Sequence, residues 1–250
     1  FFNKIFTWND DIVDGNKYIK LNLARKFPKN INKNIFTKKK LCAMITSNKF
    51  PPHSFKNELY SKRKEFIRWF EKNYPNHFDL YGEGWRKLLI SHPRLLRPFN
   101  KIPLLPEFLA KLFNQTYPSY KGEVKDKLHT LERYKFSICF ENVKDIPGYI
   151  SEKIFHSFFA GCVPIYLGAN NVLSYIPKTC FIDFRDFNNY EDLFKYIENL
   201  SDQEYLEYLN SIEKYLNSKQ SQQFKSEVFA KIIFNSILDT INNNSMIKDN

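Results

Sequence analysis

Short apolar runs alternate with amphipathic stretches along most of this chain. The runs end in glycine or polar residues, a pattern typical of buried strands, and they cover residues 41–46, 78–81, 134–141, 162–167 and 179–183. Apolar residues spaced three and four apart predict helices over residues 58–73, 151–161, 190–200, 202–216 and 224–241. The proline-rich stretch 88–120 predicts a loop with short helices. Strands alternating with helices favour an α/β fold, a parallel sheet covered by helices on both faces.

Composition supports a globular protein and limits how it could bind a nucleotide. The chain has 250 residues, of which 43% are hydrophobic, enough for a sizeable core and too many for a disordered protein. It has only 7 glycines and contains no GxGxxG or Walker pattern. A nucleotide site is therefore expected to use side chains rather than a glycine-rich loop.

The net charge of +11 allows three kinds of anionic partner: a nucleic acid, a membrane surface or a small-molecule donor. The chain contains no RNA-binding aromatic motif, zinc-finger spacing or long basic tail, so we expect no nucleic-acid partner. No apolar run approaches the ~20 residues that a membrane span requires. Charge alone does not choose between the remaining two partners.

The four cysteines lie far apart and mostly inside apolar runs. Cysteines in such positions behave as small buried hydrophobic residues, and no Cys/His cluster suggests a metal site. We therefore expect a reducing compartment.

In a parallel sheet, ligands bind at the carboxyl ends of the strands, which here are the loops after Thr46, Glu141 and Leu167. After Glu141, Ser151 is suited to cap a helix whose first turn contains Glu152 and Lys153. The positive end of that helix would face a bound diphosphate. The residues alone leave a plainer alternative open, in which the pair is an ordinary first-turn acid and an exposed lysine.

A longer motif narrows these alternatives. The run YKFSICFENVKDIPGYISEKIFHSFFAGCVPIYLGA, followed by YIPKTCFIDFRDF, resembles the donor-binding motif of the α-1,3/α-1,4-fucosyltransferase family. The resemblance implies a GT-B fold, in which two Rossmann-like domains face each other across a cleft. On this basis residues 1–36 would end a truncated N-terminal acceptor domain, 37–243 would form the GDP-sugar-binding domain, and 244–250 would be a tail. The implied reaction is inverting transfer of fucose from GDP-fucose to a glycan hydroxyl.

The resemblance also implies roles for individual residues. The catalytic group comprises Arg63 and Lys153 on the diphosphate and Glu152 on sugar hydroxyls. Donor-binding residues would be Ser47, Asn48, Glu141, Asn142 and Tyr149. The loop before Arg63 is longer than usual in the family, which leaves Lys56, Lys62 or Arg68 as alternatives for the diphosphate.

Two features depart from the family pattern. The loop between Asn142 and Tyr149 is one residue longer and contains a proline. The glutamate that serves the family as general base lies upstream of the part matched here, and none of the nearest carboxylates, those of Asp10, Asp11 and Asp14, is assigned that role. The resemblance implies no metal and no cofactor beyond GDP-fucose, which is the donor substrate.

Alternatives to this function remain open. The donor could be another GDP-linked deoxysugar, or the chain could be a non-catalytic nucleotide-sugar-binding module. The expected partners are a GDP-sugar and a glycan acceptor, with peripheral contact to an anionic membrane. We expect a bacterial enzyme in the cytoplasm, at the inner membrane surface, or a Golgi membrane protein if the chain is a truncated eukaryotic one. The acceptor, the linkage and the oligomeric state are not predicted.

Overall fold

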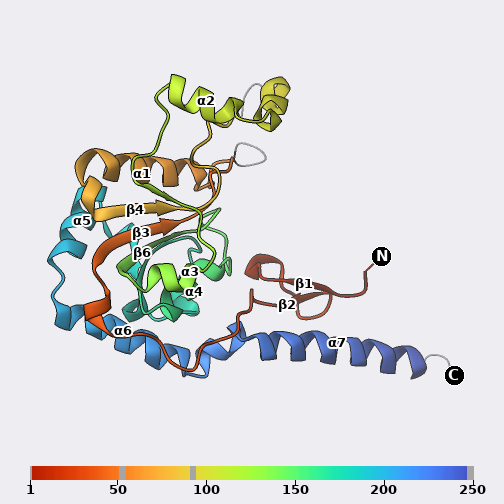
Figure 1. Cartoon of the computed structure of the whole chain (residues 1–250). Helices are drawn as coiled ribbons and strands as arrows, with labels where there is room; N and C mark the ends of the chain where they lie inside the picture. Colours follow the sequence, from red (N-terminus) through yellow and green to blue (C-terminus); the bar gives the residue numbers. More distant parts are fainter. Residues whose placement is uncertain (1, 51–54, 91–93, 247–250) are drawn as a thin grey trace.

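Six parallel strands form the central sheet of the computed structural model, which describes residues 2–50, 55–90 and 94–246 (Figure 1). The strands are β3 (Lys40–Ile45), β4 (Phe78–Tyr81), β5 (Tyr120–Gly122), β6 (Tyr134–Phe140), β7 (Val163–Leu167) and β8 (Ile182–Asp183). Their order across the sheet is β5-β4-β3-β6-β7-β8, and every neighbouring pair is parallel. The predicted parallel α/β fold is confirmed.

Helices cover both faces of this sheet. They are α1 (Tyr60–Asn73), α2 (Leu105–Leu112), α3 (Lys127–Leu131), α4 (Glu152–Phe159), α5 (Tyr190–Asn199), α6 (Asp202–Leu216) and α7 (Ser226–Met246). Short 3-10 helices lie in the segments between these helices and the strands. They are η1 (Asp10–Ile12), η2 (Ile35–Thr37), η3 (Pro75–His77), η4 (Arg94–Lys101), η5 (Val172–Ser174), η6 (Lys178–Cys180), η7 (Phe184–Asp186) and η8 (Gln220–Phe224). The predicted helix 202–216 has the observed bounds of α6, whereas the predicted strand 179–183 keeps only residues 182–183 as strand.

Alternate residues of each strand face different helices. Phe78 of β4 packs against Phe66 and Phe70 of α1, with ring centroids 5.9 and 5.2 Å apart. On the opposite face, the Cys139 sulfur of β6 lies 3.1 Å from Ser157 Oγ of α4. Because both faces are covered, most residues of β3, β6 and β7 are apolar, which explains why these strands stand out in the sequence.

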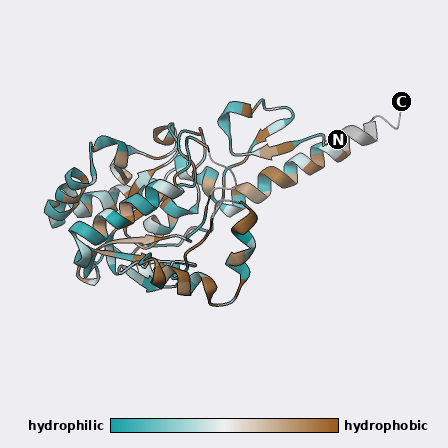
Figure 2. Cartoon of the chain, turned by 90° about the horizontal axis from the view of Figure 1, so that it is seen from above, coloured by the Kyte–Doolittle hydropathy of each residue, from teal (hydrophilic) through white to brown (hydrophobic). Residues whose placement is uncertain are grey.

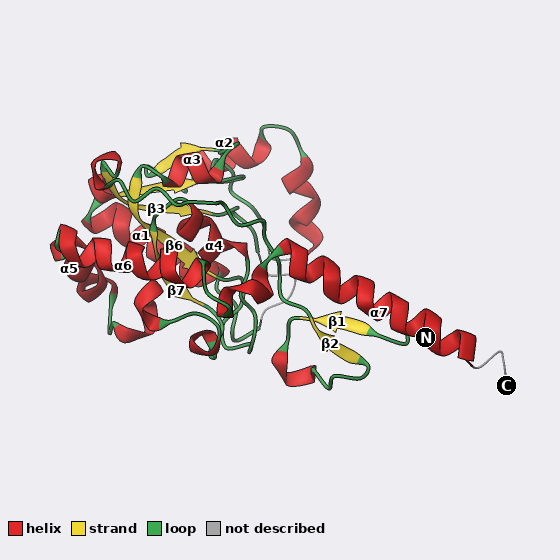
Figure 3. Cartoon of the chain, turned by 90° about the horizontal axis from the view of Figure 1, so that it is seen from below, coloured by secondary structure: helices red, strands yellow, loops and turns green. Residues whose placement is uncertain are grey.

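A second, two-stranded parallel sheet lies beside α7 (Figure 3). It comprises β1 (Ile5–Thr7) and β2 (Tyr18–Lys20), which were not predicted. The carboxylate of Asp10, between these strands, accepts hydrogen bonds from Tyr175 Oη and Asn171 Nδ2 at 2.7 Å each. This carboxylate therefore attaches the N-terminal segment to the loop that follows β7.

Two regions project from the body of the protein. One is α7, along which hydrophobic and hydrophilic residues alternate (Figure 2); its helix extends into the predicted tail, and residues 247–250 lie outside the described part. The other contains η4 and α2 (Figure 1). Within the described residues, no helix combines the length and apolar character needed to cross a membrane.

Candidate functional site

A cavity of about 350 Å³ lies at the carboxyl ends of β3 and β6. These two strands are neighbours at the point where the strand order reverses, because β4 and β5 continue on one side and β7 and β8 on the other. Loops after adjacent strands diverge at such a switch point, and the crevice between them is where open α/β sheets bind ligands. The cavity size is within the range of small-molecule sites.

Five of the eight predicted site residues line this cavity. They are Ser47, Arg63, Asn142, Glu152 and Lys153. The other three, Asn48, Glu141 and Tyr149, lie next to lining residues without contributing to the lining. The structure thus brings the predicted group together around one cavity and separates lining from supporting positions.

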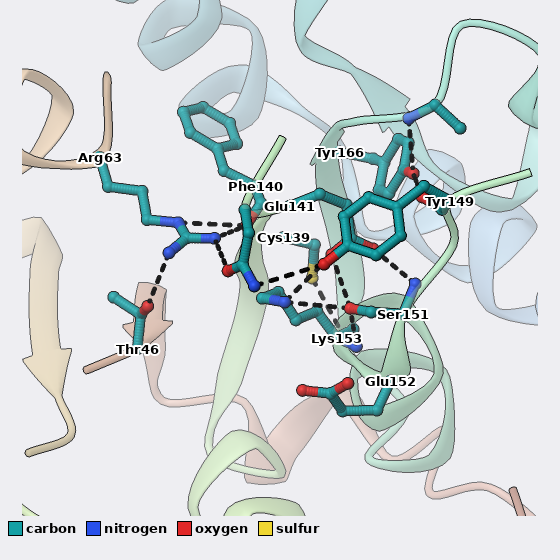
Figure 4. Close-up of polar contacts among 12 residues, drawn as sticks. Thr46, Arg63, Cys139, Phe140, Glu141, Tyr149, Ser151, Glu152, Lys153 and Tyr166 are labelled. Carbon is teal, nitrogen blue, oxygen red and sulfur yellow. Dashed lines mark hydrogen bonds and ion pairs between the residues drawn. The ribbon is translucent and has the colours of Figure 1, made fainter. Parts of the chain in front are cut away.

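Arg63 reaches the cavity from α1 and is held from several directions (Figure 4). Its Nη2 donates to the carbonyl of Phe140 at 2.8 Å and to Asn142 Oδ1 at 2.9 Å, and its Nη1 donates to Thr46 Oγ1 at 3.3 Å. These bonds join the ends of β3 and β6 through one guanidinium. Arg63 as a whole is 4% exposed. Its Nε also donates to the carbonyl of Phe140, at 3.2 Å, so the described residues accept four of the five guanidinium N–H groups and one Nη1 N–H remains for an anion.

The alternatives to Arg63 do not line the cavity. Lys62 pairs with Glu65 at 3.1 Å, and Arg68 donates to the carbonyl of Thr116 at 2.6 Å. Lys56, the remaining alternative, is exposed in the loop before α1. Of these four cations, only Arg63 meets the cavity.

Glu141 ends β6 in the interior and supports the first turn of α4 (Figure 4). It has no exposed surface, and its Oε2 lies 3.0 Å from the ammonium of Lys153 and 2.6 Å from Ser151 Oγ. Its Oε1 accepts the backbone N–H of Ser151 at 2.7 Å. Glu141 therefore does not line the cavity and fixes the position of Lys153 from the interior; its donor-binding role stays a prediction.

Lys153 keeps one N–H available for a ligand. Its ammonium has three donors, of which the described residues accept two, at Glu141 Oε2 and Ser151 Oγ, both at 3.0 Å. Ser151 also caps α4, as predicted, by accepting the backbone N–H of Lys153 at 3.4 Å. Because the protein already accepts the backbone N–H groups of Ser151 and Lys153, an anion here would meet the ammonium rather than these amides.

Asn142 lines the cavity, and Tyr149 connects it to the N-terminal segment. Asn142 Nδ2 donates to Tyr149 Oη at 3.3 Å, and the Tyr149 ring packs against Trp8 with centroids 4.6 Å apart. Burial, reinforced by the negative charge of Glu141, raises the pKa of Tyr149 to about 12. Its hydroxyl is therefore a neutral donor and acceptor near pH 7.

Asn48 organises the turn that borders the cavity on the β4 side. Its Nδ2 donates to the carbonyls of Gly84 and Lys87 at 3.1 and 3.3 Å, and its backbone N–H donates to Glu83 at 2.8 Å. The residue is 6% exposed. It thus supports the loop containing Ser47 from behind.

The structure adds Lys127 and His156 to the cavity and Arg25 beside it. Arg25 Nη2 lies 3.2 Å from Glu152 Oε2. Burial raises the pKa of Glu152, but Lys153, its own backbone amide and Arg25 outweigh this effect and lower it overall. Burial, and then the charge of Lys127, lowers the pKa of His156 to about 4. Its spacing of four residues from Glu152 on a helix would have been the signal for finding His156.

The described residues contain no group of three or more His, Cys, Asp or Glu side chains that could hold a metal ion. All four cysteines are buried and free. Burial raises the pKa of the Cys139 thiol to about 12, which makes it a poor nucleophile.

Residues 35–248 match the sequence model of the C-terminal region of glycosyltransferase family 10 (fucosyltransferase). The chain belongs to this family. Among curated family members, it is 31% identical over 166 residues to the α-(1,3)-fucosyltransferase FucT of Helicobacter pylori, covering 60% of this chain and 33% of that protein. It is 32% identical over 117 residues to an α-(1,4)-fucosyltransferase of Arabidopsis thaliana, covering 46% and 29%. The matched segment thus spans about a third of these relatives.

A solved structure of an α1,3-fucosyltransferase with GDP-fucose superposes with a TM-score of 0.58 at 19% identity, covering 94% of this chain and 70% of the other. At this identity the likeness shows the fold, and it assigns the parallel sheet and its helices to the GT-B type. The family and fold implied by the sequence motif are therefore confirmed. The roles of individual site residues stay predictions.

Proposed function

We propose that this chain binds GDP-fucose and forms the donor half of an inverting transferase that moves fucose to a glycan hydroxyl. The observation that carries the proposal is the convergence of Arg63 from α1 and Lys153 from α4 on one cavity at the switch point. Two cations that line one cavity suit a diphosphate. The choice of fucose as the sugar rests on the fucosyltransferase names of the family and its members.

In the proposed reaction, the acceptor oxygen attacks the anomeric carbon from the face opposite the diphosphate. The bond between that carbon and the β-phosphate oxygen breaks, and its electron pair leaves with GDP. Arg63 and Lys153 stabilise the charge that develops on the leaving oxygens. Glu152, which lines the cavity, accepts hydrogen bonds from sugar hydroxyls.

A carboxylate must take the proton of the acceptor hydroxyl. The three aspartates nearest the expected base do not line the cavity. Asp10 is bonded to Tyr175 and Asn171, and Asp14 accepts the backbone N–H groups of Asn16 and Tyr18 at 2.8 Å each. We therefore propose that the base is supplied from outside residues 1–20.

Isothermal titration of GDP and UDP into the protein tests the donor assignment. We expect GDP to bind and to be preferred over UDP, and Lys153→Ala to weaken GDP binding by about 10–100-fold, because a charge-assisted hydrogen bond is lost. Lys195→Ala, which removes a surface lysine of α5 paired with Glu191 at 3.5 Å, should leave the affinity unchanged. Absence of GDP binding, or a preference for UDP, would overturn the assignment.

A further inference from the structure

The segment from residue 94 to 113, which we call the 94–113 surface, exposes an unusual amount of apolar side chain. Of the 18 large hydrophobic side chains that are exposed among the described residues, 8 lie here. They are Leu95, Leu96, Phe99, Ile102, Leu104, Phe108, Leu112 and Phe113. A patch this concentrated is typical of an interaction site, whereas single exposed apolar residues are ordinary.

Helix α2 exposes large apolar side chains on one face and is buried on another. Leu104, which precedes the helix as its N-cap, and Phe108 and Leu112 within it recur every four residues and are 76, 60 and 63% exposed, whereas Pro106 and Ala110 are buried. Side chains with this spacing lie on one helix face. The outward face is therefore a continuous apolar stripe of the kind that an interfacial helix presents.

Positive charge accompanies this stripe. Residues 94–113 contain four basic side chains, those of Arg94, Arg97, Lys101 and Lys111, and one acidic side chain, that of Glu107, for a net charge of +3. Lys101 and Lys111 are exposed next to the apolar residues. A symmetric contact between two copies would bring these like charges together, which disfavours a second copy as the partner.

Apolar residues flanked by lysine and arginine match the headgroup boundary of an anionic bilayer, where side chains such as Phe and Leu enter the acyl region and ammonium groups meet phosphates. We propose that the 94–113 surface docks this protein onto an anionic lipid bilayer. The stripe of Leu104, Phe108 and Leu112 enters the boundary, and Lys101 and Lys111 contact lipid phosphates.

This surface is linked to the cavity by a short path. The carbonyl of Pro106 in α2 accepts the backbone N–H of Leu88 at 2.8 Å, and Asn48 Nδ2 donates to the adjacent carbonyl of Lys87 at 3.3 Å. Asn48 in turn follows Ser47, which lines the cavity. Docking through α2 would thus hold the rim of the cavity close to the lipid surface. The proposal does not depend on which nucleotide the cavity binds.

Co-sedimentation with vesicles tests the proposal, using phosphatidylcholine alone and phosphatidylcholine mixed with phosphatidylglycerol. We expect binding to the mixed vesicles that weakens with added salt. Phe108→Ser with Leu112→Ser should lower the partition coefficient by about tenfold or more, and Lys101→Gln and Lys111→Gln by about fivefold each. Thermal unfolding and GDP titration establish that each variant is folded.

A matched control lies on α7, where Phe234 and Ile241 are 60 and 57% exposed. Phe234→Ser with Ile241→Ser removes a similar apolar area and should leave vesicle binding unchanged. Three outcomes would overturn the proposal. The first is that the protein binds neutral and mixed vesicles equally, or binds neither. The second is that the α7 variant loses as much vesicle binding as the α2 variant. The third is that the α2 variant converts a dimer to a monomer without a change in vesicle binding.

Discussion

The ammonium of Lys153 lies 3.0 Å from Oε2 of Glu141, a carboxylate without any exposed surface. The lysine itself is 18% exposed at the cavity wall. The pair thus spans from the core to the ligand side, and the buried member determines where the exposed member points.

Glu141→Gln should lower the free energy of unfolding by about 3 kcal/mol, because it leaves the Lys153 charge without its buried partner. Urea denaturation measures the change. Asp202→Asn is the control, since it removes one member of a surface pair with Lys135 at 2.9 Å whose aspartate side chain is 62% exposed. We expect it to cost less than about 1 kcal/mol. Equal losses in the two variants would contradict the supporting role of Glu141.

Arg63→Lys should weaken GDP binding by about tenfold, because lysine keeps the charge but cannot make all the bonds to Phe140, Asn142 and Thr46 that fix the guanidinium at the cavity. Titration calorimetry gives the affinity. Arg68→Lys, on the same helix but away from the cavity, is the matched control and should bind GDP as the parent protein does. If Arg68→Lys weakened binding and Arg63→Lys did not, the diphosphate role would pass to Arg68.

His156 should make the protein less stable between about pH 6.5 and pH 4. Its pKa is lowered from an ordinary 6.5 to about 4 by burial and by the charge of Lys127. The unfolded chain therefore gains a proton in this window before the folded protein does, and stability falls with falling pH by up to about 1.4 kcal/mol per unit.

Denaturation curves across that window should be flatter for His156→Gln than for the parent protein. His129→Gln provides the comparison, because its side chain is 78% exposed in α3. A parent-like slope in His156→Gln would assign the pH dependence to other groups.

Below this window, Asp79 adds a further loss of stability as the pH falls below 3.8. Its pKa is lowered because the bonds from Lys40 and Tyr134 outweigh the effect of burial.

Gly148→Ala should destabilise the protein by about 1–3 kcal/mol more than Gly15→Ala. Both glycines have positive φ angles, +77° and +74°, so a side chain strains the backbone equally at each. A Cβ at Gly148 would lie 2.3 Å from the carbonyl of Trp8, whereas nothing lies within 4 Å of one at Gly15.

The difference between these two variants measures the contact of the N-terminal segment with the loop before α4. A shift in tryptophan fluorescence should accompany Gly148→Ala, because Trp8 also packs against Tyr149. Similar losses of stability in both variants would mean that the segment moves away at little cost.

The central strands and long helices could be predicted because their patterns are local. The run Phe78–Tyr81 contains three large apolar residues and is stopped by Gly82, and α6 repeats its apolar residues over four turns. By contrast, β1, β2 and β5 have three residues each, and β1 and β2 pair only with each other. A strand of three residues is too short to show any periodicity, so only its pairing in the folded protein reveals it.

The candidate site likewise contains residues whose positions could be predicted from the sequence and residues whose positions could not. The positions of Ser151 and Lys153 followed from the cap and the first turn of a helix. The burial of Glu141 could not be foreseen, because a glutamate at the end of a strand can point to solvent as easily as to the interior. Lys127 and His156 join the cavity only because α3 and α4 pack side by side, which depends on tertiary contacts.

The pairing of β3 with β6 has a consequence for how the protein is made. It joins Lys40 to Tyr134, so the two halves of the sheet can meet only after most of the chain has left the ribosome. Until then, β3 exposes one apolar edge that β6 will later cover, and closing so long a loop is slow. We therefore expect the cavity to form only after β6 has joined the sheet, and partly synthesised chains to depend on chaperones.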